Sequence, residues 1–118
     1  MLSLNVRTRI FISIESISMK NSYSGLISKT KQIIGEDPLS GYMFVFFNKR
    51  RDYVKALYWD ESGYCIWSKR LEVGTFEIPK ADNESCKKVA IDRKKLMLIL
   101  EGISLKNIKE RKRFCLKK

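Results

Sequence analysis

One stretch decides the fold, residues 37–79, which reads DPLSGYMFVFFNKRRDYVKALYWDESGYCIWSKRLEVGTFEIP. Apolar runs of strand length alternate in it with polar or glycine-containing breaks, which is typical of strands joined by tight turns. We expect strands over 42–47, 52–59 and 64–71, and a short fourth strand over 75–78. Connections this short cannot make parallel crossovers, so the stretch predicts an antiparallel meander.

The turns decide which side chains share a face of this sheet. If they lie at 48–51 and 60–63, strand alternation places a mixture of aromatic, aliphatic and basic residues on one face: Phe44, Phe46, Tyr53, Lys55, Leu57, Trp59, Tyr64, Ile66 and Arg70. The other face carries fewer charges: Val45, Phe47, Val54, Ala56, Tyr58, Cys65, Trp67 and Leu71, with Lys69 near its end. Both faces are largely apolar, so helices must cover at least one of them. The second face is the better core candidate, while the first is either a nucleic-acid surface or a second core with its cations at the rim.

The segments before this stretch predict another strand and a helix. Residues 6–15 are rich in β-branched residues and alternate partially, so we expect a strand that pairs with the meander. From Tyr23 to Ile34, apolar residues recur at intervals of three and four, which predicts an amphipathic helix that Gly35 ends.

After the meander, residues 80–88 form a polar loop, and Asp92 is a candidate N-cap for a second helix that ends at Leu100 or Glu101. The sequence thus predicts an α+β fold, an antiparallel meander sheet of four to five strands with two helices, both expected on one face. We expect a single domain over residues 1–105, followed by a basic tail over 106–118.

Composition favours an anionic partner. The chain carries 24 Lys and Arg against 13 Asp and Glu, a formal net charge of +11, and nucleic acid is the commonest partner of so basic a domain. The alternatives are that the charge serves solubility alone or that the partner is an acidic protein. No clean signal-peptide core or apolar membrane span is visible, so we expect a cytoplasmic protein, associated with the nucleoid if it binds DNA, that does not bind membranes.

Cofactor and metal sites find little support in the sequence. The chain has no histidine, and its three cysteines lack a CxxC spacing, so neither a Cys/His zinc site nor a His-based catalytic triad is available. A metal nuclease would need carboxylates that converge on one ion. Asp52 and Asp60 lie at opposite ends of one expected strand, roughly 26 Å apart at the usual rise per residue. We therefore expect no enzyme activity, no cofactor and no catalytic or metal-binding residues.

The candidate nucleic-acid contacts are basic and aromatic residues of the hairpins, together with the tail. Cations would contact phosphates, and exposed rings could stack on unpaired bases. The candidates are Lys49, Arg50, Arg51, Tyr53, Lys55, Trp59, Lys69, Arg70, Arg111, Lys112 and Arg113. The alternatives are that Trp59 belongs to the core and that the tail is a solvated terminus.

Four motifs, in order, resemble one known family: Asp37-Pro38-x-Ser40-Gly41, Phe44-Val45-Phe46, Lys55-x-Leu57-x-Trp59-Asp60-x-x-Gly63, and Lys69-Arg70-Leu71-Glu72-x-Gly74-x-Phe76. The family is the accessory protein encoded by the second open reading frame (Orf2-like) of the insertion sequence sixty-six elements of bacteria, often called TnpB. An upstream motif is weakened here, because Ser18 and Ser24 stand where the family has carboxylates.

The resemblance implies a role in DNA transposition beside a separate transposase that carries the catalytic carboxylates. We expect a non-catalytic accessory factor that binds DNA at transposon ends. The alternative is a scaffold that bridges the transposase and another element-encoded protein without touching DNA; aromatic and arginine side chains on an uncovered sheet face would serve that role equally well. An uncovered apolar face would also make a homodimer plausible.

Overall fold

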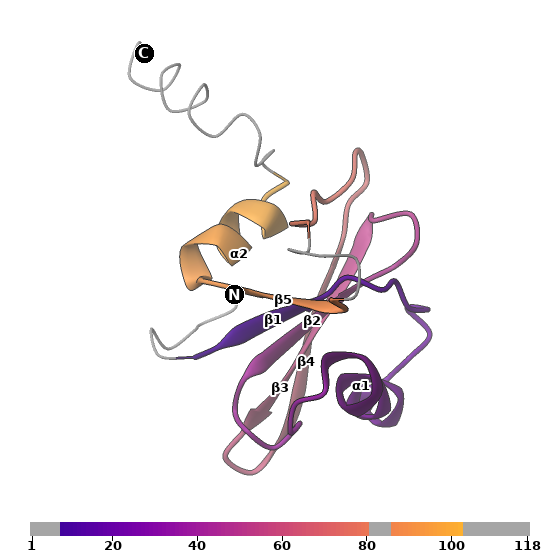
Figure 1. The fold of residues 1–118 in the computed structure, drawn as a ribbon. Coiled ribbons are helices and arrows are strands. Elements are labelled where there is room, and N and C mark those ends of the chain that lie inside the picture. Colours follow the sequence, from indigo (N-terminus) through magenta and orange to yellow (C-terminus); the bar gives the residue numbers. More distant parts are fainter. Residues whose placement is uncertain (1–7, 81–85, 103–118) are drawn as a thin grey trace.

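Five strands form one mixed sheet in the order β4-β3-β2-β1-β5 (Figure 1). The computed structural model describes residues 8–80 and 86–102. Along the chain the elements are β1 (Ile10–Ser13), α1 (Tyr23–Lys29), the π-helical turn η1 (Thr30–Ile34), β2 (Met43–Phe47), β3 (Tyr53–Asp60), β4 (Gly63–Arg70), β5 (Lys88–Ile91) and α2 (Arg93–Leu100). The α+β class is confirmed.

The predicted register of the β3–β4 hairpin is confirmed, and so are the predicted faces of both hairpins. In the β3–β4 hairpin, Trp59 lies opposite Tyr64 and Tyr53 lies opposite Arg70. In the β2–β3 hairpin, Phe46 lies opposite Lys55. The alternation predicted from the two turns therefore assigns the side chains of β2, β3 and β4 to the correct faces.

The sheet is not a simple meander, because β1 pairs in parallel with β2. The chain between them crosses over through α1 and η1, the connection that parallel neighbours require. Gly35 ends this helix as predicted, with a left-handed φ of 74°. The Gly35 N–H donates a hydrogen bond to Thr30 O at 2.8 Å. This bond spans five residues instead of the usual four, which makes η1, the segment before Gly35, π-helical.

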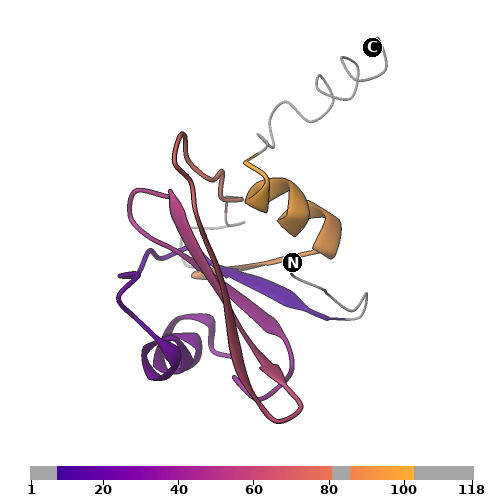
Figure 2. The same cartoon turned by 180° about the vertical axis from the view of Figure 1, so that it is seen from behind.

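The two helices lie on opposite faces of the sheet, which corrects the expectation that both share one face (Figures 1 and 2). Leu26 of α1 packs in one buried cluster with Phe44 and Phe46. Leu96 of α2 packs in the other, with Met43 and the remaining odd-numbered residues of β2. Both faces of the central strand are apolar, so each needs a helix to exclude water.

The strand predicted over 75–78 is wrong. This segment is irregular, and Phe76 is buried there against the ring of Phe47, with a centroid separation of 5.6 Å. Its apolar residues anchor the segment on the core rather than in the sheet, since Pro79 is also buried and Ile78 packs against the same cluster. The loop predicted over 80–88 overlaps residues outside the described ranges, and its last residue begins β5, a four-residue edge strand that the sequence analysis missed.

Asp92 caps α2 as predicted, because its carboxylate accepts a hydrogen bond from Lys95 N–H at 2.7 Å. We expect Asp92→Ala to lower the free energy of unfolding by about 1 kcal/mol, since one helix N–H loses its acceptor. Urea denaturation measures the change. Asp92→Asn is the matched control, because asparagine caps about as well; an equal loss in both variants would contradict the capping role.

Candidate nucleic-acid interface

The turn between β2 and β3 carries three adjacent exposed cations, Lys49, Arg50 and Arg51. Asn48 organises this turn. Its side-chain oxygen accepts hydrogen bonds from Asp52 N–H at 3.0 Å and Tyr53 N–H at 3.1 Å, and its amide nitrogen donates to the Asp52 carboxylate at 2.7 Å. These bonds replace the ladder that the turn interrupts, so the cations project from a fixed backbone.

A second segment anchors the same turn from outside. After β4 the chain folds back, and Leu71 N–H donates to Asp52 O at 2.7 Å. Further on, Phe76 N–H donates to Arg51 O at 2.6 Å while its ring is buried beneath. Arg51 has a left-handed φ of 59°, a conformation that costs a non-glycine residue energy and that these contacts hold in place.

Among the described residues, none supplies a partner for the cations of this turn. Within residues 8–80 and 86–102, no hydrogen bond or ion pair engages the side chain of Lys49, Arg50 or Arg51. Arg70, exposed at the end of β4 and opposite Tyr53, lies at the same end of the sheet. We call Lys49, Arg50, Arg51 and Arg70 the basic end. Their charges are available to an external anion.

Two other predicted contacts have internal partners. The ammonium of Lys55 donates to Asn21 O at 2.8 Å, just before α1, and the ammonium of Lys69 donates to Leu100 O at 2.9 Å, at the end of α2. Each lysine thus ties one face of the sheet to the helix on that face. For Lys69 the arrangement is also favourable because a cation at a helix C-terminus complements its dipole.

We expect Lys55→Met to lower the free energy of unfolding by about 1–2 kcal/mol, because Asn21 O loses a charged donor at a partly buried site. The midpoint of urea unfolding measures the loss. Lys31→Met, at an exposed position of η1, is the control and should stay within about 0.5 kcal/mol of wild type. Equal midpoints for both variants would show that Lys55 is not a structural tie.

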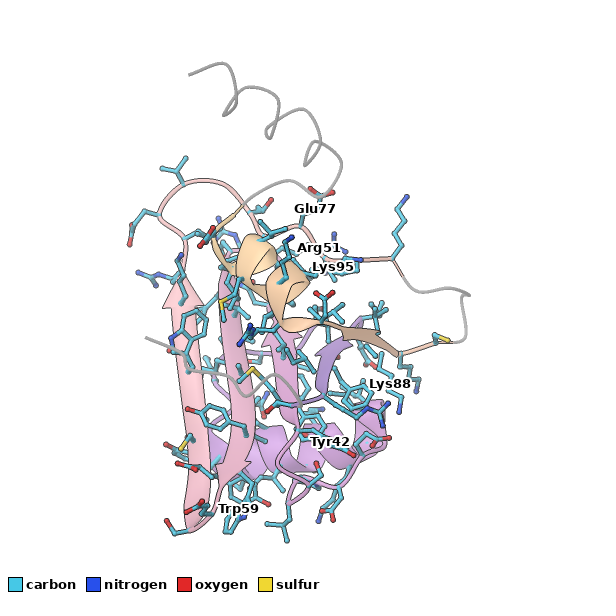
Figure 3. All side chains as sticks on the ribbon, turned by 90° about the vertical axis from the view of Figure 1, so that its left-hand side faces the viewer. Tyr42, Arg51, Trp59, Glu77, Lys88 and Lys95 are labelled. Carbon is cyan, nitrogen blue, oxygen red and sulfur yellow. The ribbon has the colours of Figure 1, made fainter. Side chains whose placement is uncertain are left out.

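The predicted aromatic contacts do not join the basic end. Trp59 packs edge-on against Tyr64, with a centroid separation of 5.0 Å and an interplanar angle of 71°. Figure 3 places Trp59 and Arg51 at opposite ends of the molecule, as expected from the six residues, roughly 20 Å of strand, that separate Trp59 from Tyr53. Tyr53 alone borders the basic end, with the Lys55 ammonium 6.0 Å from its ring centroid. Arg111, Lys112 and Arg113 lie outside the described residues.

Another group of cations was missed because it joins distant segments. The Arg9 guanidinium lies 5.0 Å from the Phe11 ring centroid and 5.4 Å from that of Tyr42. Lys88 lies 5.1 Å from the same Phe11 ring and forms an ion pair with Glu36 at 3.1 Å. The order of the strands in the sheet brings these residues together, and no local sequence motif predicts that they meet.

Electrostatics elsewhere perturb one phenol. Burial raises the pKa of Tyr58, and its neighbours Cys65 and Asp60 raise it further. This residue lies in the β3–β4 hairpin beside Cys65, away from the basic end.

Among the described residues, no three His, Cys, Asp or Glu side chains gather in a way that could hold a metal ion. No helix in the described ranges is both long and apolar enough to cross a membrane.

Comparison with known proteins gives one family and two relatives. A family model described as "IS66 Orf2 like protein" matches residues 8–110. "Uncharacterized protein y4hO" of Sinorhizobium fredii (strain NBRC 101917 / NGR234) is 27% identical over 110 residues, which cover 93% of either chain. "Uncharacterized protein y4jC" of the same organism is 34% identical over 71 residues, 60% of this chain and 61% of that protein. No solved structure matches.

Proposed function

This chain belongs to the family of IS66 Orf2-like proteins, accessory proteins of insertion sequences, and we propose that it acts in transposition as a non-catalytic DNA-binding factor. It would work alongside a separate transposase that performs the chemistry. The observation that supports this proposal is the basic turn: three exposed cations on an anchored backbone, without internal partners in the described part of the chain.

The chemistry of the basic end fits phosphate rather than base recognition. Lysine and arginine side chains on a turn can neutralise backbone phosphates of either duplex or single-stranded DNA, and such contacts supply affinity and position without reading sequence. A hairpin tip can also enter a groove, as known strand-based readers do. The net charge of +11 would speed the approach to any nucleic acid.

The hydrogen bonds that Lys55 and Lys69 make inside the protein reduce the set of residues that we propose contact DNA. Their ammonium groups are held by helix-flanking carbonyls, so we assign phosphate binding first to the basic end. The tail over 106–118 would add contacts, since it begins four residues after the last described residue and is rich in Lys and Arg.

Fluorescence anisotropy tests the proposal, with the full chain titrated into labelled duplex and single-stranded oligonucleotides at two salt concentrations. If each of the three cations of the turn contacts one phosphate, log affinity falls with log salt with a slope of about −2.7. Raising salt from about 50 to 200 mM should then weaken duplex binding roughly 40-fold. Contacts from the tail would steepen this slope. Absence of binding at low salt would overturn the proposal.

The second candidate is a protein scaffold that bridges the transposase and another element-encoded factor. The half-buried Trp59–Tyr64 pair at the tip of the β3–β4 hairpin favours it, because aromatic side chains of this kind anchor protein interfaces. Salt separates the two candidates, because the affinity of an apolar protein contact changes little over the range of salt that weakens phosphate binding roughly 40-fold. Binding to the transposase but to no oligonucleotide would favour the scaffold.

A further inference from the structure

Strand β4 is a long edge of the sheet with an open outer side. It spans eight residues, whereas β5 at the opposite edge spans four. Figure 3 shows β4 as the outermost strand, on the left, with no described element beyond it. The chain leaves β4 inward, because Leu71 N–H donates to Asp52 O of the β2–β3 connection. Alternate N–H and C=O groups of β4 therefore face outward without a strand partner in the described structure.

The middle of this edge lacks the usual protection against pairing. Natural edge strands carry charges, proline or bulges that prevent association with another chain. Residues 64–68 of β4 read Tyr-Cys-Ile-Trp-Ser, without a charge, a proline or a glycine. The helices leave this segment only half covered, with Tyr64 and Ile66 at the margin of one buried cluster and Trp67 at the margin of the other. A strand with this composition and exposure is suited to pairing.

The charges at the two ends of the strand select its partner. The turn that leads into β4 carries exposed Asp60 and Glu61, and the strand ends in exposed Lys69 and Arg70. When two copies of β4 pair antiparallel, the acidic start of each strand lies beside the basic end of the other, and the two-fold symmetry makes this contact twice. A register centred near Cys65 keeps like charges apart and leaves only uncharged residues in the middle.

We propose that β4 is the interface of a homodimer, in which a second copy of this chain extends the sheet across its open edge in antiparallel orientation. The backbone pairing supplies the hydrogen bonds that β4 lacks on its outer side, and the rings of Tyr64 and Trp67 gain cover from the second hairpin. The positive net charge of each copy opposes association, so the complementary strand ends matter for it. The homodimer does not require DNA binding. Because its test contains no nucleic acid, this proposal and the proposed function can fail separately.

Sedimentation equilibrium of the full chain, over a range of protein concentrations, provides the first test. One chain has a mass of 13.8 kDa, so the expected dimer has 2 × 13.8 = 27.6 kDa. We expect the mass to rise toward the dimer value as concentration increases. A mass that stays at 13.8 kDa at every concentration would overturn the proposal.

Charge reversal then locates the interface. Asp60→Arg and Arg70→Asp are each expected to weaken the dimer roughly tenfold, because Asp60 faces Arg70 of the second copy in a register centred at Cys65 and each change replaces two symmetric attractions by repulsions. The double variant restores opposite charges and should recover wild-type association. Within one copy Asp60 lies opposite Gly63, and Arg70 is seven residues further along β4, roughly 23 Å away, so an intramolecular contact cannot produce the rescue.

Val73→Arg is the control, since Val73 is 89% exposed in the loop after β4 and changes charge without touching the edge. It should associate like wild type. Dimers that both single charge reversals leave unchanged would place the interface elsewhere and contradict the proposal, as would single-variant losses that the double variant does not reverse.

Discussion

Replacing Phe44 by alanine is expected to lower the free energy of unfolding by about 3–5 kcal/mol. Phe44 lies in the central strand with no exposed surface, and its ring stacks on that of Phe11 with a centroid separation of 6.1 Å. It supports the cluster that α1 covers. Because alanine leaves a cavity under that helix, the loss would be a large part of the roughly 5–15 kcal/mol that stabilises a typical domain.

Urea denaturation followed by circular dichroism measures this loss. Phe44→Leu keeps most of the volume and should cost less than about 1.5 kcal/mol. Val73→Ala, at the exposed loop position, should have no measurable effect. A loss below about 1 kcal/mol for Phe44→Ala would contradict the assignment of this face as a packed core.

The second large effect concerns DNA. The triple variant Lys49→Gln/Arg50→Gln/Arg51→Gln is expected to weaken duplex binding by at least tenfold, and by up to about 500-fold near 0.1 M salt if all three cations neutralise phosphates. The slope of log affinity against log salt should become shallower by about 2.7. Anisotropy titrations at several salt concentrations measure both quantities.

A matched triple variant removes the same charge from the helices: Lys29→Gln/Lys31→Gln/Lys94→Gln changes α1, η1 and the first turn of α2. If net charge alone governs binding, the two triple variants will lose equal affinity, which would contradict a localised contact. If the basic turn is the contact, the helix variant will retain most of the affinity and of the salt slope. Urea midpoints for both variants check that neither effect comes from unfolding.

The central hairpins could be predicted from sequence because their turns are local. Gly63 and the polar residues at 48–51 fix where each strand reverses, and strand alternation then fixes the facing residues. The caps of both helices were also readable, since Gly35 and Asp92 act through bonds within a few residues. Each of these predictions rests on short-range chemistry.

The errors arose where distant segments meet. Parallel pairing of β1 with β2 and the pairing of β5 with β1 join segments 30 or more residues apart, and nothing in the four residues of β5 marks them as a strand. The assumption that one apolar face would suffice as core placed both helices on the same side. The structure instead buries both faces of β2.

The candidate site could be predicted only in part, again because some of its contacts join distant segments. The cations of the turn were predicted as candidate contacts, but the internal roles of Lys55 and Lys69 depend on carbonyls 34 and 31 residues away. The distance between Trp59 and the basic end follows from the hairpin itself and could have been deduced from the strand length.

The most direct test of the central claim is a titration of ¹⁵N-labelled protein with a short duplex, followed by two-dimensional NMR at low salt. Our account predicts that the largest chemical-shift changes fall on the backbone amides of 48–51 and on Arg70, with little change in α1. Shift changes confined to the helices, or binding that leaves residues 48–51 unperturbed, would contradict it.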